Sequence, residues 1–336
     1  MNKKNWLLLF FACAIAFTSF NSCSKDDDDD SSTDTGPTEW SSSLVFPGYS
    51  RSGAASFTAD GSTYVVGGYV NPSIGFPNDG YKFDGSWSSI EAFPGEARHE
   101  AVGFSINGIG YVGTGLNMDK AFNDFYSYNP ANDSWAPIAD FPGDARYGAV
   151  AFSLGNYGYV GLGREWGGAR DFVDFYRYDP SDDTWEEIET PPFNNKRAYA
   201  FAFVIGDKAY VGGGRAGNST NLPGDFVSFD GSAWQKLNPL ERNDDDHTYD
   251  ARKYGAAAFT VGNYGYVVSG RNANTITSTV WKYEPSSDTW TDKHQALTVD
   301  PREKAVGFTF DGKGYITTGV NSNGVLDNTY EFTPRR

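Results

Sequence analysis

Basic side chains recur at two fixed positions of this sequence. The first position holds one cation in each of six similar segments: Arg51, Arg98, Arg146, Arg197, Lys253 and Arg302. The second position lies directly after a glycine and holds an arginine in three of these segments: Arg164, Arg215 and Arg271. A guanidinium group binds carboxylates, sulfates and phosphates through two parallel hydrogen bonds. The nine cations therefore predict a binding site for an acidic ligand.

The same cations have an alternative, architectural explanation. Glu96 in FPGEAR and Asp144 in FPGDAR stand next to two members of the six-fold set and could neutralise it. The three arginines at the second position are harder to explain in this way, because an architectural need would recur in every segment. The other three segments carry different residues at that position: Tyr69, Leu116 and Val320.

Trp166 is the one tryptophan of nine without a place in the repeat described below or in the leader. It lies beside Arg164 and Glu165 in the segment REWGGARD. An exposed aromatic ring next to an arginine suits stacking on a sugar face or on a cation. The alternative is a loop anchor that is tucked between two repeats. If the protein is an enzyme, the candidate groups for proton transfer are Glu165, Glu96 and Asp144.

Composition excludes several other chemistries. The chain has 27 basic and 43 acidic residues, a net charge of −16, which argues against nucleic acid as a partner. No glycine-rich phosphate loop precedes a helix, so we expect no cofactor. The segment 241–253 gathers four aspartates and a histidine, but these lack the fixed spacing of a calcium loop, and we predict a solvated loop without metal: Asp244, Asp245, Asp246, His247 and Asp250.

A repeat of about 50 residues must position these side chains. Six tryptophans lie 47, 48, 50, 49 and 56 residues apart: Trp40, Trp87, Trp135, Trp185, Trp234 and Trp290. Before each of the last five stand an apolar run such as RYGAVAF (146–152), a short turn, a second run such as YVGLG (159–163) and an aromatic run such as FYRY (175–178). Each unit therefore reads as four antiparallel strands, and a period of this length indicates stacked or radial repeats.

The double-glycine strand, the aromatic strand and the tryptophan strand resemble the Kelch repeat over residues 40 to 333. The resemblance implies an all-β propeller with six blades. The last unit stops at Arg336 without a tryptophan strand, and Trp40 precedes the first complete unit. We therefore expect Thr38–Leu44 to supply the outer strand of the last blade and to close the ring. The predicted propeller domain comprises residues 39–336, and we expect a monomer.

Kelch relatives suggest three kinds of function for such a domain. The first is binding of an acidic glycan or peptide by the variable loops around the arginines, as in the arginine-rich pocket of Kelch adaptors of ubiquitin ligases. The second is an enzyme similar to N-acetylneuraminate mutarotase, with an arginine holding a carboxylate. The third is a scaffold for other proteins. A copper enzyme like galactose oxidase, also a Kelch propeller, needs a cysteine-linked tyrosine, and no cysteine remains after Cys23. We favour the first, with the acidic ligand bound at the arginine-rich mouth of the central channel of the propeller.

The N-terminal segment predicts export and lipid anchoring. Lys3 and Lys4 precede an apolar stretch from Trp6 to Phe17, which is typical of a signal peptide. The segment 1–22 ends before Cys23 in a sequence that resembles a bacterial lipobox, so we expect acylation of Cys23 and a membrane anchor. Residues 23–38 are acidic and polar and predict a flexible tether. The run SKDDDDD resembles the surface-export signal of Bacteroidota lipoproteins, which implies an outer-membrane protein at the cell surface.

Overall fold

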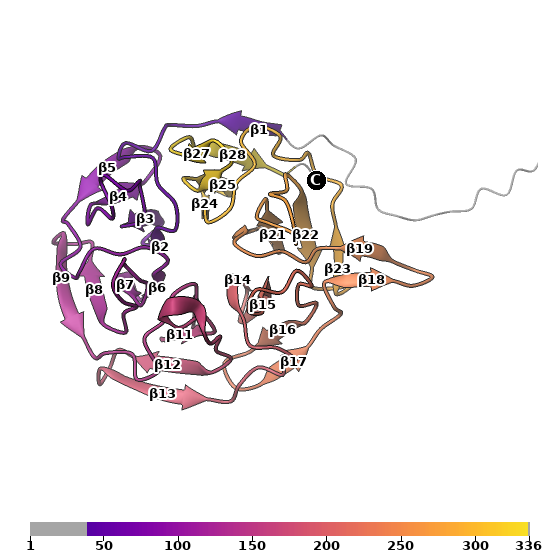
Figure 1. Cartoon of the computed structure of the whole chain (residues 1–336), viewed down its shortest axis with the longest axis horizontal. Coiled ribbons are helices and arrows are strands. Elements are labelled where there is room, and N and C mark those ends of the chain that lie inside the picture. The colour runs from indigo at the N-terminus through magenta and orange to yellow at the C-terminus, as the bar shows by residue number, and fades with distance from the viewer. Residues whose placement is uncertain (1–38, 335–336) are drawn as a thin grey trace, which may run out of the picture. The chain divides into compact units, whose positions relative to one another are not determined.

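The computed structural model describes residues 39–334, which form a closed ring of six four-stranded antiparallel sheets (Figure 1). The predicted signal peptide, the lipidation of Cys23 and the predicted tether lie outside the described residues. Among the residues that the structure describes, no helix is long and apolar enough to cross a membrane. The predicted all-β, six-bladed propeller is confirmed.

Each blade is a meander of four strands, ordered from the ring centre outward. Blades one to three comprise β2 (Ala55–Ala59), β3 (Ser62–Val66), β4 (Gly80–Phe83) and β5 (Trp87–Ile90); β6 (Val102–Ile106), β7 (Ile109–Gly113), β8 (Phe125–Asn129) and β9 (Ser134–Ile138); and β10 (Val150–Leu154), β11 (Tyr157–Gly161), β12 (Phe175–Asp179) and β13 (Thr184–Ile188). Blades four and five comprise β14 (Ala198–Ile205), β15 (Lys208–Arg215), β16 (Phe226–Phe229) and β17 (Trp234–Lys236); and β20 (Ala257–Val261), β21 (Tyr264–Val268), β22 (Val280–Glu284) and β23 (Thr289–Thr291).

Blade six draws its strands from both ends of the described chain. It contains β24 (Val306–Phe310), β25 (Lys313–Thr317), β28 (Tyr330–Thr333) and, as its outer strand, β1 (Glu39–Ser42). Trp40 lies opposite Phe332 in the antiparallel register of β1 and β28, and their rings are 4.8 Å apart. The pairing lies within the segment Thr38–Leu44 from which closure was expected. It gives blade six the same strand count as the other blades and leaves β28 without a free edge.

The core lies between neighbouring blades, and the repeated aromatic positions fill it. In blade three, for example, Phe152 stacks on Tyr159 at 5.2 Å and lies near Phe229 of blade four. Small residues are required where the inner strands crowd together. A Cβ on Gly158 would lie 2.1 Å from the ring of Phe104 in the preceding blade. This close approach explains the glycine of the repeated strand.

Five of the six blade tryptophans join their blade to the preceding part of the ring by a hydrogen bond. The indole N–H of Trp135 donates to the carbonyl of Glu91 at 2.9 Å, and that of Trp185 donates to Ala139 at 3.0 Å. Trp40, Trp87 and Trp234 make the equivalent bond. Trp290 in blade five does not, and its buried indole N–H has no partner among the described residues. The tryptophans that recur in the sequence therefore connect neighbouring blades by hydrogen bonds.

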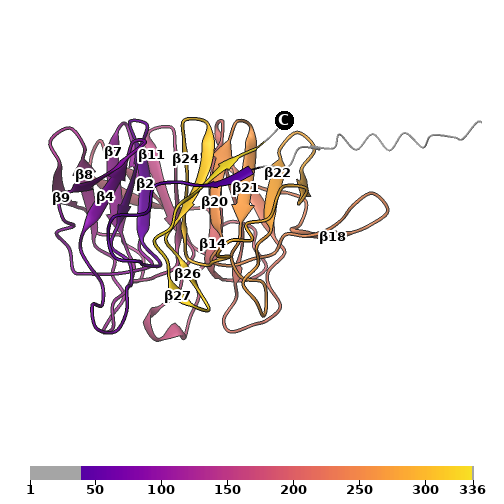
Figure 2. The same ribbon diagram turned by 90° about the horizontal axis from the view of Figure 1, so that it is seen from above.

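Three short elements depart from the six-fold pattern. The hairpin of β18 (Glu241–Asn243) and β19 (Thr248–Asp250) projects from the rim of the ring between blades four and five (Figure 1). The 3-10 turn η1 (Trp166–Gly168) and the hairpin of β26 (Val320–Asn321) and β27 (Gly324–Val325) lie at the lower side of the ring in Figure 2. These three elements lie in connections between strands and leave the framework of the blades unchanged.

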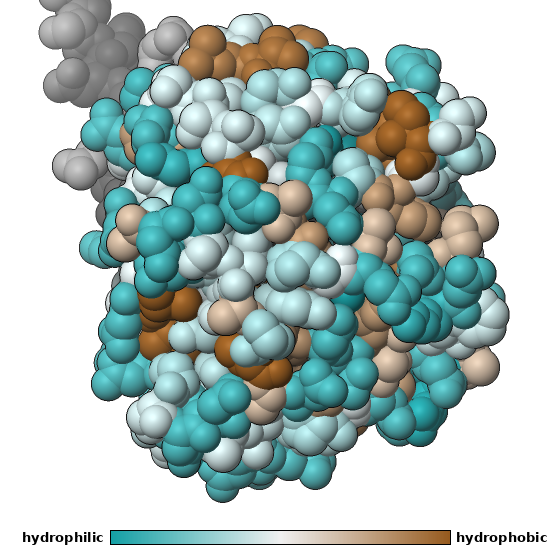
Figure 3. Space-filling view, turned by 90° about the vertical axis from the view of Figure 1, so that its left-hand side faces the viewer, coloured by the Kyte–Doolittle hydropathy of each residue, from teal (hydrophilic) through white to brown (hydrophobic). Residues whose placement is uncertain are grey.

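On the outer wall beside β5 and β9, apolar residues lie as separate spots among hydrophilic ones (Figure 3).

Candidate functional site

The six-fold set of cations is buried inside the ring. Between 0% and 3% of the surface of each residue is exposed to solvent: Arg51, Arg98, Arg146, Arg197, Lys253 and Arg302. They lie in the connections that enter the inner strands, as the sequence predicts. Their side chains do not line an open channel mouth. The expectation that this set binds an acidic ligand is therefore wrong, because a ligand cannot reach the guanidinium groups.

Each buried arginine of blades one to four is paired with an aspartate of its own blade. Arg146 donates to the two carboxylate oxygens of Asp174 at 2.6 and 2.9 Å. It also donates to the backbone carbonyls of Leu162 at 3.1 Å and Asp144 at 2.9 Å, and its guanidinium lies 4.0 Å from the centroid of Phe172. The equivalent pairs are Arg51 with Asp79, Arg98 with Asp124 and Arg197 with Asp225. We call each of these buried arginine–aspartate pairs, which join two connections of one blade, a clip.

The partners of these arginines differ from the acids that the sequence suggested. Glu96 and Asp144 contribute only their backbone carbonyls to the clips. Their carboxylates form exposed ion pairs instead, with Lys120 at 2.6 Å and Arg170 at 2.8 Å. A signal for the true partners was present in the sequence. An aspartate stands just before the third strand of four blades, 26 or 28 residues after the arginine.

Blades five and six replace the aspartate by neutral groups. The ammonium group of Lys253 donates to Thr277 at 2.6 Å, to the carbonyl of Ser269 at 3.0 Å and to the hydroxyl of Thr279. Burial without a directly bound carboxylate lowers the pKa of Lys253 to about 7. Arg302 pairs with the side-chain oxygen of Asn328 at 2.7 Å, and burial lowers its pKa to about 10. At these two positions the buried cation is therefore bound by neutral acceptors and not by a carboxylate.

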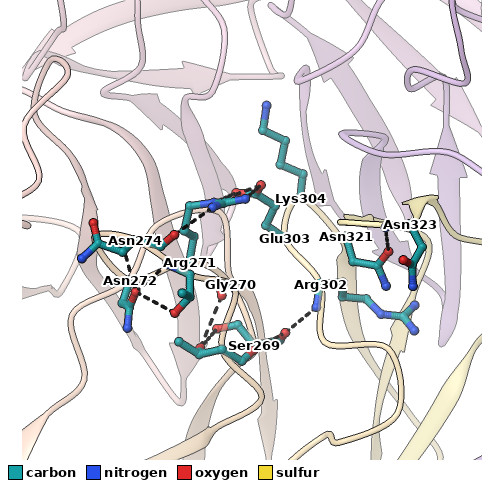
Figure 4. A network of polar contacts seen from close by, with 12 residues as sticks. Ser269, Gly270, Arg271, Asn272, Asn274, Arg302, Glu303, Lys304, Asn321 and Asn323 are labelled. Carbon is teal, nitrogen blue, oxygen red and sulfur yellow. Dashed lines mark hydrogen bonds and ion pairs between the residues drawn. The ribbon is translucent and has the colours of Figure 1, made fainter.

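Of the three arginines at the second position, two are neutralised. Arg164 is buried and donates to Asp171 at 2.6 and 3.2 Å and to the carbonyl of Gly217 at 2.6 Å. Arg271 donates to Glu303 at 2.8 Å and 3.1 Å, and the two side chains face each other across the connection into blade six (Figure 4). Neither acid was identified from the sequence. Both arginines are therefore committed within the fold.

Arg215 is the exception among the three. It donates only to backbone carbonyls of its own loop, at 3.0 Å to Asn218 and 3.3 Å to Ser219. Its guanidinium lies 5.5 Å from the centroid of the Tyr254 ring. No carboxylate within residues 39–334 forms an ion pair with it. Arg215 thus presents a guanidinium group without an acidic partner, held in place by its loop and by an aromatic neighbour.

A closed ring of six backbone hydrogen bonds surrounds the axis near Arg164 and Arg271. Each bond joins the residue two positions after the clip cation to its counterpart in a neighbouring blade, at 2.6 to 3.1 Å. All six residues have positive φ between 54° and 63°: Gly53, Glu100, Gly148, Tyr199, Gly255 and Lys304. Blades one, three and five use glycine, which adopts this conformation without cost, whereas blades two, four and six do not. Three non-glycine residues, Glu100, Tyr199 and Lys304, therefore adopt a conformation that favours glycine.

These three side chains converge on one another. Glu100 is buried and accepts hydrogen bonds from the ammonium group of Lys304 and, at 2.8 Å, from the hydroxyl of Tyr199. The imidazole Nδ1 of His99 lies 3.8 Å from the same carboxylate. We name Glu100, Tyr199 and Lys304 the axial cluster. Sequence reasoning missed it, although the alternation of glycine with larger residues at this position was visible.

The axial cluster has fixed protonation states near neutral pH. Burial raises the pKa of Glu100, but the charges of Lys304 and His99 and the hydrogen bonds outweigh it, and the net pKa is lowered. Burial lowers the pKa of Lys304, but attraction to Glu100 outweighs it and the net pKa is raised. Burial and the Glu100 carboxylate raise the pKa of Tyr199, and burial lowers the pKa of His99. The cluster is an ion pair with a neutral phenol and a neutral imidazole.

The remaining predicted site residues, Glu165 and Trp166, lie in the loop between β11 and β12. Trp166 is exposed at the tip of the β11–β12 loop, in η1, and its indole makes no hydrogen bond within the described residues. Glu165 lies 3.5 Å from Arg170 in a partly exposed ion pair. His99 stacks on Phe76 at 5.0 Å, with Tyr69 at 5.9 Å from the imidazole. Trp166 and Glu165 are therefore not brought together with the axial cluster by any contact in residues 39–334.

Two other features lie apart from the residues predicted to bind a ligand. The ligand atoms of Asp244, Asp246 and His247 at the tip of the β18–β19 hairpin lie within 4.8 Å of one another. Asp244 already accepts from Arg242 and from two backbone amides, so this tip is a hydrogen-bonded turn. A cavity of about 440 Å³ lies away from the axis, and its lining includes Asn194 and Lys236.

Comparison with known proteins supports the same architecture. A family model described as the Kelch motif matches residues 252–293, which cover most of blade five. A solved structure titled "Structure of YjhT" superposes with a TM-score of 0.72 and 18% identity, covering 86% of this chain and 96% of that chain. No curated protein matches the sequence. The chain folds as a six-bladed β-propeller, and one of its blades matches the Kelch motif.

Proposed function

We propose that this protein binds an acidic ligand on the face of the propeller that carries the loops between the second and third strands of each blade. Arg215 is the residue that holds the acidic group. The observation that carries the proposal is the charge balance of this face. Arg164 is neutralised by Asp171, Arg271 by Glu303, and Lys304 by Glu100. Arg215 alone among these cations lacks a carboxylate within the described residues, so it remains available to an anion.

The loop conformation around Arg215 favours binding. Its Nε and Nη2 atoms donate to the carbonyls of Ser219 and Asn218, which orients the guanidinium plane before a ligand arrives. The Nη1 atom makes no hydrogen bond within residues 39–334. Preorganisation reduces the entropy that a ligand must overcome, and a charge-assisted hydrogen bond contributes about 1.5–3 kcal/mol. The ring of Tyr254 at 5.5 Å adds an apolar surface beside the cation.

The protonation states at the axis support binding over catalysis. A general acid or base works best when its pKa lies near the working pH. Here the pKa of Glu100 is lowered and those of Lys304 and Tyr199 are raised, so each group is held in one form. Glu165, Glu96 and Asp144, the acids considered for the mutarotase-like alternative, lie in exposed or partly exposed ion pairs, and none of them contacts the axial cluster.

A printed array of acidic and neutral glycans, together with acidic and neutral peptides, tests the proposal. We expect preferential binding of acidic members and a loss of about 10-fold to 100-fold in affinity for Arg215→Ala, corresponding to the 1.5–3 kcal/mol of a charge-assisted bond. Arg177→Ala is the matched control, because it removes an arginine from the outer part of blade three with the same change in net charge. Equal binding of neutral members, or equal losses in both variants, would refute the proposal.

A further inference from the structure

The loop that follows Arg215 is fastened to the preceding blade at one residue. Gly217 lies two positions after Arg215, in the β15–β16 loop of blade four. Its N–H donates to Oδ2 of Asp171 at 2.5 Å, and its carbonyl accepts from Nη2 of Arg164 at 2.6 Å. Asp171 and Arg164 belong to the connection between β11 and β12 in blade three, the neighbouring blade of the ring (Figure 1). One buried ion pair therefore holds both backbone hydrogen-bonding groups of Gly217.

The remainder of this loop has no comparable support. Within the part of the chain that the structure describes, residues 216–221 form no other hydrogen bond to a different blade. Asn218 and Ser219 are exposed, and their carbonyls accept from Arg215 at 3.0 and 3.3 Å. A chain of contacts thus leads from the ion pair of blade three, through Gly217, to the two carbonyls that hold the Arg215 guanidinium.

The ion pair itself has a fixed place in blade three. Arg164 and Asp171 lie opposite each other in an antiparallel bridge, and beside it the N–H of Phe172 donates to the carbonyl of Gly163 at 2.9 Å. Arg164 donates to both carboxylate oxygens of Asp171, and the two residues are 6% and 9% exposed. A bidentate pair adds geometric specificity as well as energy. A buried pair of this kind can therefore serve as a rigid support for a neighbouring loop.

The support is particular to blade three and is not part of the repeated framework. Blades one, two and six have no arginine at the second position. In blade five, Arg271 pairs with Glu303 and donates to the carbonyl of Asn274 in its own loop. Among residues 39–334, Arg164 is thus the one second-position arginine that holds the corresponding loop of the next blade. That loop is the one that carries Arg215.

We propose that Arg164 and Asp171 are positioning residues for the acidic ligand. By holding Gly217, they keep the β15–β16 loop in the conformation that orients the guanidinium group of Arg215. This inference rests on the proposed function, since it concerns the residues that support the binding arginine. A binding group is most effective when its neighbours restrict it to the productive geometry before the ligand arrives. Binding would then depend on blade three, although Arg164 and Asp171 are buried and paired with each other.

Amide hydrogen exchange of the full chain without ligand tests the positioning directly. Asp171→Asn leaves one acceptor oxygen where the carboxylate supplied two, so we expect the Gly217 amide to exchange about tenfold or more faster. Phenylglyoxal should also modify Arg215 faster in this variant. Arg164→Lys keeps the charge but loses the planar fork, and we expect the same direction of change, which provides the test if Asp171→Asn does not fold.

Asp174→Asn is the matched control for these measurements. It removes the same charge from another buried arginine pair of blade three, and Asp174 forms no hydrogen bond with residues 216–221 in the described chain. A general loss of stability would affect both aspartate variants. We expect Asp174→Asn to leave the exchange of the Gly217 amide and the modification of Arg215 within about twofold of wild type.

Affinity for immobilised polyglutamate and polygalacturonate separates this inference from the ligand proposal. We expect a loss of about threefold to tenfold for Asp171→Asn and Arg164→Lys, and less than about twofold for Asp174→Asn. Unchanged exchange and affinity in the Asp171 and Arg164 variants, or equal changes in Asp174→Asn, would overturn the inference, whereas weaker binding by Arg215→Ala would leave the ligand proposal standing. If Arg215→Ala bound both probes as wild type does, the proposed function would fail, and with it the role of the pair in binding, even if Gly217 exchanged faster.

Discussion

Removing the carboxylate of Asp174 should destabilise the propeller strongly. Arg146 is fully buried, and Asp174, with 22% of its side chain exposed, supplies the only negative charge that contacts it in the described chain. Asp174→Ala would leave the guanidinium with the carbonyls of Leu162 and Asp144, while its Nη2 atom would lose its carboxylate partner. Breaking a buried pair by removing one partner costs about 3–5 kcal/mol. Each kcal/mol lowers Tm by about 2–4 °C in a large domain, so we expect a decrease of roughly 6–20 °C.

Two variants sharpen this experiment. Asp174→Asn would reproduce in blade three the arginine–asparagine pair that blade six has naturally in Arg302 and Asn328, so we expect a smaller loss, about 1–3 kcal/mol. Glu186→Ala breaks an exposed pair with Arg177 and should cost less than about 1 kcal/mol. Thermal and urea denaturation would measure all three. If Asp174→Ala cost no more than Glu186→Ala, the clip explanation of the buried arginines would be refuted.

Three further predictions concern other parts of the ring. The pKa of Lys253 is about 7 in the fold and about 10.5 in the unfolded chain, so between these pH values the unfolded chain binds one more proton. The free energy of unfolding of wild type should therefore rise by about 1 kcal/mol per pH unit relative to that of Lys253→Met, as measured by urea titrations at increasing pH. Parallel pH profiles of the two proteins would contradict this. Lys304→Gly should destabilise the protein, because it leaves the buried Glu100 without its cation. Adding Glu100→Gly should restore stability, since glycine suits the positive φ of both positions, whereas additive losses in the double-mutant cycle would argue against coupling of the two residues. Trp40→Ala should cost about 2–4 kcal/mol in thermal denaturation by weakening the packing of β1 on Phe332, whereas an unchanged Tm would show that closure does not depend on this contact.

The strands and their order could be predicted from the sequence because each blade repeats the same local pattern. The alternation of Phe152 with small residues, the turn after Leu154 and the glycine at position 158 specify two paired strands without long-range information. Closure followed from counting, since β28 needed an outer neighbour and Trp40 precedes the first complete unit. These inferences rest on local periodicity, which a sequence displays directly.

The site was harder to predict because it depends on side-chain direction and on contacts between distant residues. The register of Arg146 was correct, but a sequence does not show whether a side chain points to the channel or into its own blade. Its partner Asp174 is 28 residues away. The contact of Glu100 with Lys304 spans 204 residues and arises only when the ring closes. Arg215 was predicted together with Arg164, and only the structure shows that Arg164 has a carboxylate partner whereas Arg215 donates only to backbone carbonyls.

Arginine footprinting tests the central claim that Arg215 is offered to a ligand while the clip arginines are architecture. The native protein would be treated with phenylglyoxal, and modification at each arginine followed by mass spectrometry over time. We predict that Arg215 is modified early, while Arg51, Arg98, Arg146, Arg197 and Arg302 remain unmodified until the protein unfolds. An acidic ligand selected on the array should slow the reaction of Arg215. Modification of the clip arginines in the folded protein at the rate of Arg215 would contradict the account.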